Sequence, residues 1–387
     1  TYNDSGTTTS NNTAVGFKAL YANLTGANNV AVGMNALTAN TVGTLNTAVG
    51  TYAMETNVDG SRNAAFGYGA LRTFDPSSAT DTYNTGLGYA AGSSMTTGTL
   101  NTAVGGNTMA ATTTGGNNTA VGALALDANT TASNNVAVGS YAMSANTTGT
   151  RNVAVGRGAL DANTTANDNT AVGYNAVGAN IDGASNTGIG ASALLVLTSG
   201  ANNTAVGHNA LYTCQGTSSN TGIGAMAGGA ITTGAFNTFV GSLSGDGLTT
   251  GGNNVGVGYR ALSAPSFTGS HNTAIGTDAL LSNTTASYNT AMGTYALDAN
   301  LIGTYNTAVG YNSLTANTGE INSAFGAKSL ASNTSGSGNT AVGWRSLEAN
   351  VTSHNNTAVG YLALTANTTA AENTAVGRSA LRATTTG

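Results

Sequence analysis

Asn118-Thr-Ala-Val-Gly122 carries the motif NTAVG, which also stands at Asn46–Gly50, at Asn101–Gly105 and at many later places. The motif and its close variants occur 22 times, and most closing glycines follow one another at the constant spacing seen from Gly16 to Gly33 and from Gly105 to Gly122. The consensus of the whole unit is NTAVGxxALxANTTGxx. A fixed short period of this kind indicates a structural unit that stacks on copies of itself.

Positions in the unit are numbered here from the closing glycine, which is position 0. Position −4 is Asn in all 22 copies, and position −2 is Ala or Gly in every copy except the one with Phe239. Position −1 is Val in most copies and otherwise Ile, Leu, Met or Phe. Position +3 is Ala or Ser nearly throughout, +4 is usually Leu or Met, and +7 is often Asn.

This unit predicts a solenoid built of β-structure. Seventeen residues are too few for a helical hairpin repeat, which needs more than about 30. The NTAVG run favours a short strand followed by a turn, and the ALxAN run favours a second short strand. We expect the glycine at 0 to adopt a backbone conformation closed to other residues, and the Asn at −4 to form an amide ladder between coils. The predicted fold is all-β: a parallel β-solenoid, or β-roll, of about 22 coils with a 17-residue repeat, forming one continuous domain over residues 1–387.

Two coils depart from the regular length. The coils at 68–88 and 259–276 are both longer than the regular unit, and they contain the only two prolines, Pro76 and Pro265. Proline cannot donate to a ladder of backbone hydrogen bonds. We therefore predict that a loop leaves the regular stack in each of these coils.

The exchange of residues between +4 and +7 indicates an interior. Where the leucine at +4 is missing, an apolar residue replaces the asparagine at +7. The three cases are Gly92 with Met95, Gly228 with Ile231, and Gly245 with Leu248. Loss of volume at one position is matched by gain at the other, as expected if both face one close-packed core. We place +4 and −1 in the core and +7 at its edge.

The small residue at −2 suggests a partner. Side chains alternate across a strand, so a valine at −1 that points inward leaves −2 pointing outward. An outward column should tolerate many residue types, yet −2 is tiny in 21 copies. We expect another copy of the chain to pack there, forming a symmetric homotrimer or a filament. A monomeric solenoid with two packed faces is the alternative.

Composition excludes several classes of protein. Only 6% of the 387 residues are charged, against about 25% in a typical globular protein. The ten Lys and Arg are scattered and form no basic patch for nucleic acid, and no apolar run approaches the ~18 residues of a membrane span. Cys214, the single cysteine, cannot form an internal disulfide, and we expect it to be a small, partly buried thiol.

The titratable residues indicate no catalytic or metal centre. The three histidines, at 208, 271 and 354, fall at different phases of the repeat. Asp127, Asp161 and Asp298 recur at +5, but in separate coils, whereas a pair of catalytic carboxylates must lie within about 10 Å. We therefore predict no catalytic, cofactor-binding or metal-binding residues, no cofactor, and a protein that is not an enzyme.

Aromatic residues recur next to the turn. At +1 stand Tyr68, Tyr89, Tyr174, Tyr259, Tyr311, Trp344 and Tyr361. We expect them to form a stripe along one outer edge, where they either bind sugars or other surfaces or shield corners and neighbouring chains. Threonine at −3 forms another column, which would suit ice binding if it were regular, but Val30 and Val136 interrupt it.

The motif also resembles a known family. The run NNTAVG at Asn117–Gly122, with relatives at Asn134–Gly139 and Asn355–Gly360, is similar to the NSVAIG repeat in the heads of YadA-like trimeric autotransporter adhesins. The whole unit also resembles Asn/Thr/Gly-rich repeats of tail-fibre-type proteins of phages and bacteria. The adhesin resemblance implies a left-handed β-roll, a trimer, export to the cell surface and binding to host or matrix surfaces. The unit of this chain departs from the repeat in those heads in being longer.

Together these features predict an extracellular structural or adhesive fibre segment, located at a cell or virion surface. Its partners would be itself and carbohydrate or other cell-surface ligands, without nucleic acid and without a membrane span in this segment. The alternative function is a monomeric ice- or glycan-binding β-solenoid.

Overall fold

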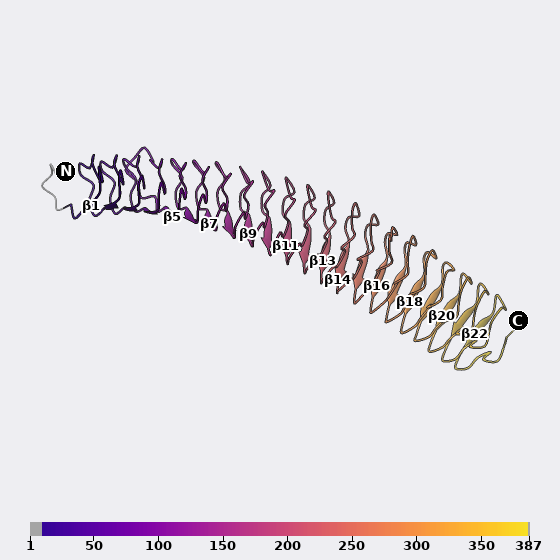
Figure 1. The fold of residues 1–387 in the computed structure, drawn as a ribbon. Helices are drawn as coiled ribbons and strands as arrows, with labels where there is room; N and C mark the ends of the chain where they lie inside the picture. The colour runs from indigo at the N-terminus through magenta and orange to yellow at the C-terminus, as the bar shows by residue number, and fades with distance from the viewer. Residues whose placement is uncertain (1–9, 386–387) are drawn as a thin grey trace. The chain divides into compact units, whose positions relative to one another are not determined.

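The computed structural model describes residues 10–385 and contains 22 strands of three residues, one in every repeat. Contacts between residues group the chain into two compact units, Thr1–Ser192 and Ala193–Gly387. Within each unit successive strands pair in parallel, one coil after the next (Figure 1). None of residues 10–385 is helical. Both units are therefore parallel β-solenoids in which one coil corresponds to one sequence repeat, which confirms that part of the prediction.

Each strand covers positions −3 to −1 of its repeat. The first unit contains β1 (Thr13–Val15), β2 (Val30–Val32), β3 (Thr47–Val49), β4 (Ala64–Phe66), β5 (Thr85–Leu87), β6 (Thr102–Val104), β7 (Thr119–Val121), β8 (Val136–Val138), β9 (Val153–Val155), β10 (Thr170–Val172) and β11 (Thr187–Ile189). The second unit contains β12 (Thr204–Val206), β13 (Thr221–Ile223), β14 (Thr238–Val240), β15 (Val255–Val257), β16 (Thr273–Ile275), β17 (Thr290–Met292), β18 (Thr307–Val309), β19 (Ser323–Phe325), β20 (Thr340–Val342), β21 (Thr357–Val359) and β22 (Thr374–Val376).

The ALxAN run is not a strand, so the prediction of two strands per coil was wrong. Positions +2 and +4 have positive φ in all 22 coils, as at Tyr141 (φ 60°) and Met143 (φ 51°). A residue in this left-handed region turns the chain, and two of them so close together prevent an extended strand. Neighbouring coils are still joined here, since the backbone N–H of Met143 donates to the Ala159 carbonyl at 3.0 Å.

The glycine at 0 has the special conformation that the repeat predicts. Its φ lies between +124° and +139° in all 22 coils, a region that residues with a side chain rarely adopt. The next coil also leaves it no room. A Cβ on Gly122 would lie 2.6 Å from the carbonyl carbon and oxygen of Gly139. Glycine is therefore required at this corner both by backbone conformation and by close stacking.

The asparagine at −4 forms the expected ladder, and its hydrogen bonds explain why the residue never varies. Asn118 Nδ2 donates to the Ala132 carbonyl of its own coil at 2.9 Å and to Asn101 Oδ1 at 3.1 Å. Asn118 Oδ1 accepts the backbone N–H of Asn135, the next asparagine in the column, at 3.0 Å. One side chain thus closes its own coil and ties it to both neighbours, using a donor and an acceptor in the fixed geometry of an amide.

The side chains of the strands face the opposite way from the prediction. From β2 to β22 the middle residue, at −2, is buried, whereas the flanking residues at −3 and −1 are half-buried or exposed. The core consists of −2 with +3, +4, +7 and the asparagine at −4. The burial of +4 is thus confirmed, whereas +7, which was predicted at the edge of the core, lies fully inside it. The placement of −1 in the core was wrong.

The two lengthened coils accommodate their extra residues in turns. After the buried Phe74, residues 77–81 are exposed, and the chain rejoins the stack where Asp81 bridges to Ser61 and Thr82 is buried. In the other coil Pro265 and Ser266 are exposed, while Phe267 returns to the core and its backbone bridges to Leu248.

Candidate binding surfaces

The outward face of each sheet is formed by positions −3 and −1, and we call it the sheet face. Position −1 is apolar in all 22 strands, and position −3 is Thr, Val, Ala or Ser. The face contains no charged residue in either unit. Several of its large side chains are well exposed, among them Leu87 (48%), Met292 (41%) and Phe325 (42%). An unbroken apolar column therefore faces outward, which the sequence interpretation had placed inside.

The small residues at −2 are explained by the interior rather than by a partner. A Cβ on Gly86 would lie 3.0 Å from Leu71 Cγ and 3.1 Å from the Ala91 carbonyl oxygen. The leucine at +4 and the opposite backbone leave space for little more than a methyl group. The prediction that a second chain covers −2 is thus wrong, because −2 faces the interior and −3 and −1 face outward.

The seven predicted aromatic residues at +1 are on the surface, with exposed fractions between 40% and 61%, and so is Phe17 at the same position (68%). Only two pairs of them stack. Tyr68 and Tyr89 have ring centroids 5.5 Å apart, and Trp344 and Tyr361 have theirs 5.0 Å apart. Neighbouring arginines cover other rings, as Arg157 does at Tyr174 (5.8 Å). Each stacked ring has one face against its partner, so less ring face is open to a ligand than a continuous stripe would offer.

A second aromatic column was missed by the sequence interpretation. His271, Tyr288 and Tyr305 all stand at −5, directly before the invariant asparagine. Their rings stack with centroid distances of 4.9 and 5.0 Å and are nearly parallel. The same position carries the ion pair between Arg151 and Asp168, at 2.7 Å. The phase of these residues was available in the sequence, but −5 is too variable to attract notice.

The three histidines lie in separate coils. The described residues include no group of three His, Cys, Asp or Glu side chains placed to hold a metal ion. His354 Nδ1 accepts the backbone N–H of Ser337 at 3.0 Å, which gives that ring a structural contact. Cys214 is fully buried, and burial raises the pKa of its thiol to about 12. The thiol is therefore neutral and inaccessible at pH 7.

Three aspartates at +5 share one electrostatic feature. Burial raises the pKa of Asp127, Asp246 and Asp298 above the usual value for an aspartate. One carboxylate oxygen of each, Oδ1, is buried without a hydrogen-bond partner among the described residues. An incompletely solvated carboxylate favours its protonated form. These groups consequently affect how the stability of the folded chain depends on pH.

Comparison with known proteins leaves the chain defined by its fold alone. The chain is a parallel β-solenoid, and neither the known protein families nor the curated proteins include a match to its sequence. The resemblance to adhesin heads and tail-fibre repeats therefore stays a prediction. Over the part of the chain that the structure describes, there is no helix long and apolar enough to cross a membrane.

Proposed function

We propose that this chain is a structural and adhesive fibre segment of a cell or virion surface, and that it associates with copies of itself through the sheet face. The observation that carries the proposal is the outward column at −1, which is apolar in every strand. A column in contact with water would accept polar residues in at least some of its 22 positions. A constraint of this kind is typical of a surface that another molecule covers.

The size of the sheet face suits a stable interface. Eleven strands spaced about 4.8 Å apart make a face roughly 50 Å long, and three residues per strand make it about 10 Å wide. Each unit carries one such face of about 500 Å², so two copies that meet through one face would bury about 1,000 Å² in total, the lower limit for a specific interface. A second copy of the chain has the same spacing between coils, so the same contact can repeat at every strand. We expect a homotrimer.

A self-associated solenoid would serve attachment through repetition. Each surface column recurs once per coil, so weak contacts at one position are available many times on each chain and again on each copy. Linked weak contacts dissociate far more slowly than single ones. The low charge and the variable aromatic and polar residues at +1 and −5 are compatible with contact to neutral surfaces such as glycans.

The state of the native chain tests this proposal. Sedimentation should give about three times the chain mass of 37.7 kDa. Replacing Val138 and Val172 of the sheet face by lysine should release monomers, because the charges would be buried at the interface. The matched control places lysines at +1, with Thr51→Lys and Ala123→Lys, and should remain associated. A native chain that sediments as a monomer would contradict the proposal.

The adhesive part needs its own measurement. Retention on a glycoprotein-coated surface should be strong for the native chain and should weaken by at least tenfold for the sheet-face variant, because single chains lose avidity. Equal retention of monomer and oligomer would show that self-association does not serve attachment.

The alternative, a monomeric ice-binding solenoid, is favoured by one observation. Threonine at −3 and aliphatic residues at −1 lie side by side on the sheet face, repeated at the spacing of the coils. Val30, Val136, Val153 and Val255 are half-buried at −3, as are the threonines from Thr47 to Thr357, so they preserve the shape of the column. A native monomer that inhibits ice recrystallisation, and loses that activity with Val138→Lys and Val172→Lys, would replace the fibre proposal.

A further inference from the structure

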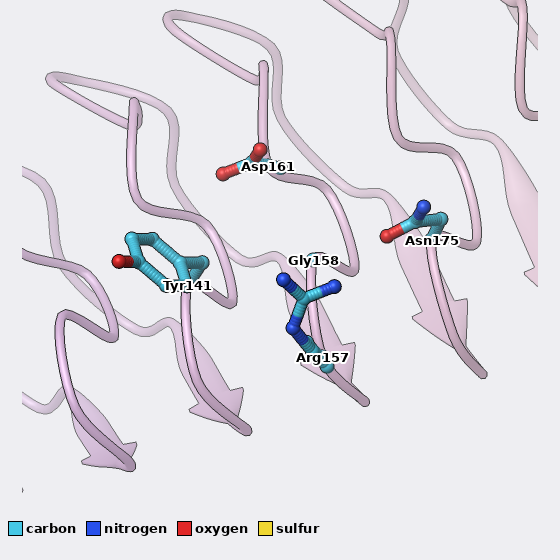
Figure 2. A pocket seen from close by; sticks show the side chains of 5 residues that line it. All are labelled: Tyr141, Arg157, Gly158, Asp161 and Asn175. Atoms are coloured by element: carbon cyan, nitrogen blue, oxygen red, sulfur yellow. The ribbon is translucent and has the colours of Figure 1, made fainter.

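We infer that the first unit carries a discrete site for a pyranose sugar between Tyr141, Arg157, Asp161 and Asn175. The site is a surface cavity of about 280 Å³, and the floor residue is Gly158. Three consecutive coils contribute to it, because Tyr141 precedes Gly158 by one coil and Asn175 follows it by one coil. In Figure 2 the Arg157 guanidinium lies between Tyr141 and Asn175, and the Asp161 carboxylate lies across the same gap.

The cavity exists because one side chain is missing from a column. Position +2 carries a side chain in all coils except those with Gly69 and Gly158. At Gly158 the neighbouring Asn175 leans into the vacant place, and a Cβ there would lie 2.4 Å from Asn175 Oδ1. The gap is thus a feature of this coil and not of the repeat.

The other glycine of the column provides an internal comparison. Beside Gly69 the residue at +5 is Arg72, whose guanidinium lies over the Tyr52 ring at 4.8 Å and whose Nε pairs with Glu55 at 2.8 Å. Tyr68 packs edge-on against the same Tyr52 ring, with centroids 5.6 Å apart. These side chains lie around Gly69, although a Cβ there would meet only Arg72 Cδ, at 3.9 Å. At Gly158 the residue at +5 is the shorter Asp161, and Asn175 takes the place of the missing side chain and lines the cavity.

The side chains around Gly158 are held in place before any ligand arrives. The Ser144 hydroxyl donates a short hydrogen bond to Asp161 Oδ1. The Arg157 guanidinium rests over the Tyr174 ring, and its Nη1 lies 3.5 Å from the Tyr174 hydroxyl. Groups fixed in this way lose little conformational freedom when they bind.

The chemistry of the lining favours a neutral hexopyranose. Tyr141 is 44% exposed and offers an aromatic surface to the C–H groups of a sugar ring. Asp161 supplies acceptors, Arg157 donors, and the Asn175 amide both, which matches neighbouring hydroxyl groups that donate and accept at once. The opposite charges of Arg157 and Asp161 balance, which disfavours a charged ligand. The volume is close to the lower end for ligand pockets and suits one ring.

This site deepens the proposed attachment function and rests on it for the class of ligand. The probes are methyl glycosides of glucose, galactose and mannose, titrated into the full chain and followed by saturation-transfer NMR and calorimetry. We expect saturable binding of at least one probe. Gly158→Asn should reduce that binding by tenfold or more, because it fills the gap. Asparagine suits the backbone, since Asn107 and Asn175 occupy +2 with φ of 53° and 50°.

Three further variants make the test specific. Gly69→Asn introduces the same residue at the matched glycine and should leave binding unchanged. Asp161→Asn should weaken binding by at least fivefold while keeping the shape of the cavity, whereas Asp127→Asn, at +5 in another coil, should not. Circular dichroism and sedimentation of every variant check the fold and the association state.

The outcomes separate this inference from the fibre proposal. Absence of saturable binding to all three probes, or binding that survives Gly158→Asn, would overturn the sugar site and leave the self-association result intact. Loss of association with retained sugar binding would overturn the fibre proposal alone.

Discussion

Two stretches of the second unit build the same coil with different cores. From Leu197 to Leu248 position +7 is occupied by Leu, Cys, Ile and Leu, all fully buried. From Asn283 to Asn367 it is asparagine in every coil, also fully buried. We call these the apolar stretch and the amide stretch. A 17-residue coil can therefore be closed either by apolar packing or by hydrogen bonds at the same position.

The difference shows which asparagine column is essential. In the amide stretch the Gly336 carbonyl accepts from both Asn322 at −4 (2.8 Å) and Asn333 at +7 (2.9 Å). In the apolar stretch the Gly251 carbonyl accepts from Asn237 at −4 (3.0 Å), and the residue at +7 is Leu248. The asparagine at +7 is a second donor to a carbonyl that already has one. It can be replaced, whereas the asparagine at −4 cannot.

Two coils of the apolar stretch also relieve backbone strain. A leucine at +4 has φ near 50°, which costs roughly 1–2 kcal/mol for a residue with a side chain. Gly228 and Gly245 stand at +4 in the apolar stretch with φ of 61° and 63°, where glycine is at ease. The core volume that leucine would supply comes instead from +7 and, in one coil, from Phe239.

The largest effect is expected at Phe239, the one large residue at −2. A Cβ on Gly245 would lie 2.4 Å from its ring, one on Gly256 2.8 Å, and one on Gly228 3.1 Å. Three glycines thus leave space for one ring. Phe239→Ala should open a cavity and lower the free energy of unfolding by about 3–5 kcal/mol.

Urea denaturation measures this loss, and a second variant checks its cause. Adding Gly245→Leu restores the consensus pair of Ala at −2 and Leu at +4 and should recover a large part of the stability. If the double variant is no more stable than Phe239→Ala, the exchange of volume between −2 and +4 is not what keeps this coil closed.

Next in size is a pair of variants that compares the two stretches directly. Asn237→Ala removes the acceptor of the Asn254 N–H (2.9 Å) and the donor to the Gly251 carbonyl. Asn322→Ala removes the acceptor of the Asn339 N–H (3.0 Å), but Asn333 still donates to the Gly336 carbonyl. A buried polar group without a partner costs about 1–3 kcal/mol. Asn237→Ala should therefore be the more destabilising by roughly that amount.

Hydrogen exchange of the amides in the two altered coils, together with urea midpoints, would give the difference. Equal losses would mean that the second donor at +7 contributes nothing to closing the coil, and the distinction between the stretches would reduce to side-chain volume.

The same residues show how far the sequence could predict the structure. The repeat length, the strand at NTAVG, the glycine conformation, the ladder at −4 and the burial of +4 all follow from local chemistry repeated 22 times. Which face of the strand points inward did not follow, because apolar character alone would place the valine at −1 inside and the alanine at −2 outside. The interior of a 17-residue coil is too narrow for that choice. The coincidence of Phe239 with Gly245 was the available sign that −2 and +4 share one space.

The surfaces were less predictable than the core. The aromatic column at +1 was located from its phase, but the stacking of Tyr68 on Tyr89 depends on the spacing between particular coils. The cavity at Gly158 depends on left-handed residues at +2 that carry their side chains out of the coil. No local pattern indicates this conformation in residues such as tyrosine or leucine, although asparagine, which also occurs at +2, adopts it readily.

A smaller effect is expected at the aspartates of +5, one in each stretch. Asp246 and Asp298 both have a raised pKa, caused first by burial. Because the pKa is raised in the folded state, the protonated carboxyl group is the form that favours the folded protein. It is fully present below the unfolded value of 3.8 and is lost as the pH rises through the folded value.

Asp298→Asn should therefore stabilise the protein at pH 7, by less than about 1 kcal/mol because solvent reaches part of the group. The gain should vanish below pH 3.8. Thermal midpoints at pH 3, 5 and 7 measure this dependence. Asp246→Asn should behave similarly, because the two stretches differ at +7 and not at +5. A gain in stability in only one of the two variants would show that the core next to the carboxyl group determines its effect.

The smallest effect is expected where the column of asparagines at +7 ends. In the first unit it ends at Asn57, because the next residue at +7 is Phe74. Asn57 Nδ2 donates to Asn40 Oδ1 at 3.1 Å, but its own Oδ1 is buried without a partner. The Gly60 carbonyl also accepts from Asn46 at 2.8 Å, so it stays paired without Asn57. Asn57→Leu removes one unpaired oxygen and leaves another, on Asn40. The free energy of unfolding should change by less than about 0.5 kcal/mol.

Asn40→Leu, one coil earlier in the same ladder, is the matched comparison. It leaves Asn23 Oδ1 without the Asn40 donor that lies 2.8 Å away, and it removes no unpaired oxygen in exchange. It should cost about 1 kcal/mol more than Asn57→Leu. Urea midpoints of the two variants would decide the point. Equal losses of unfolding free energy in the two variants would contradict this prediction. The end of the asparagine column at +7 would then accept leucine no better than its interior, and packing volume would decide where asparagine gives way to an apolar residue.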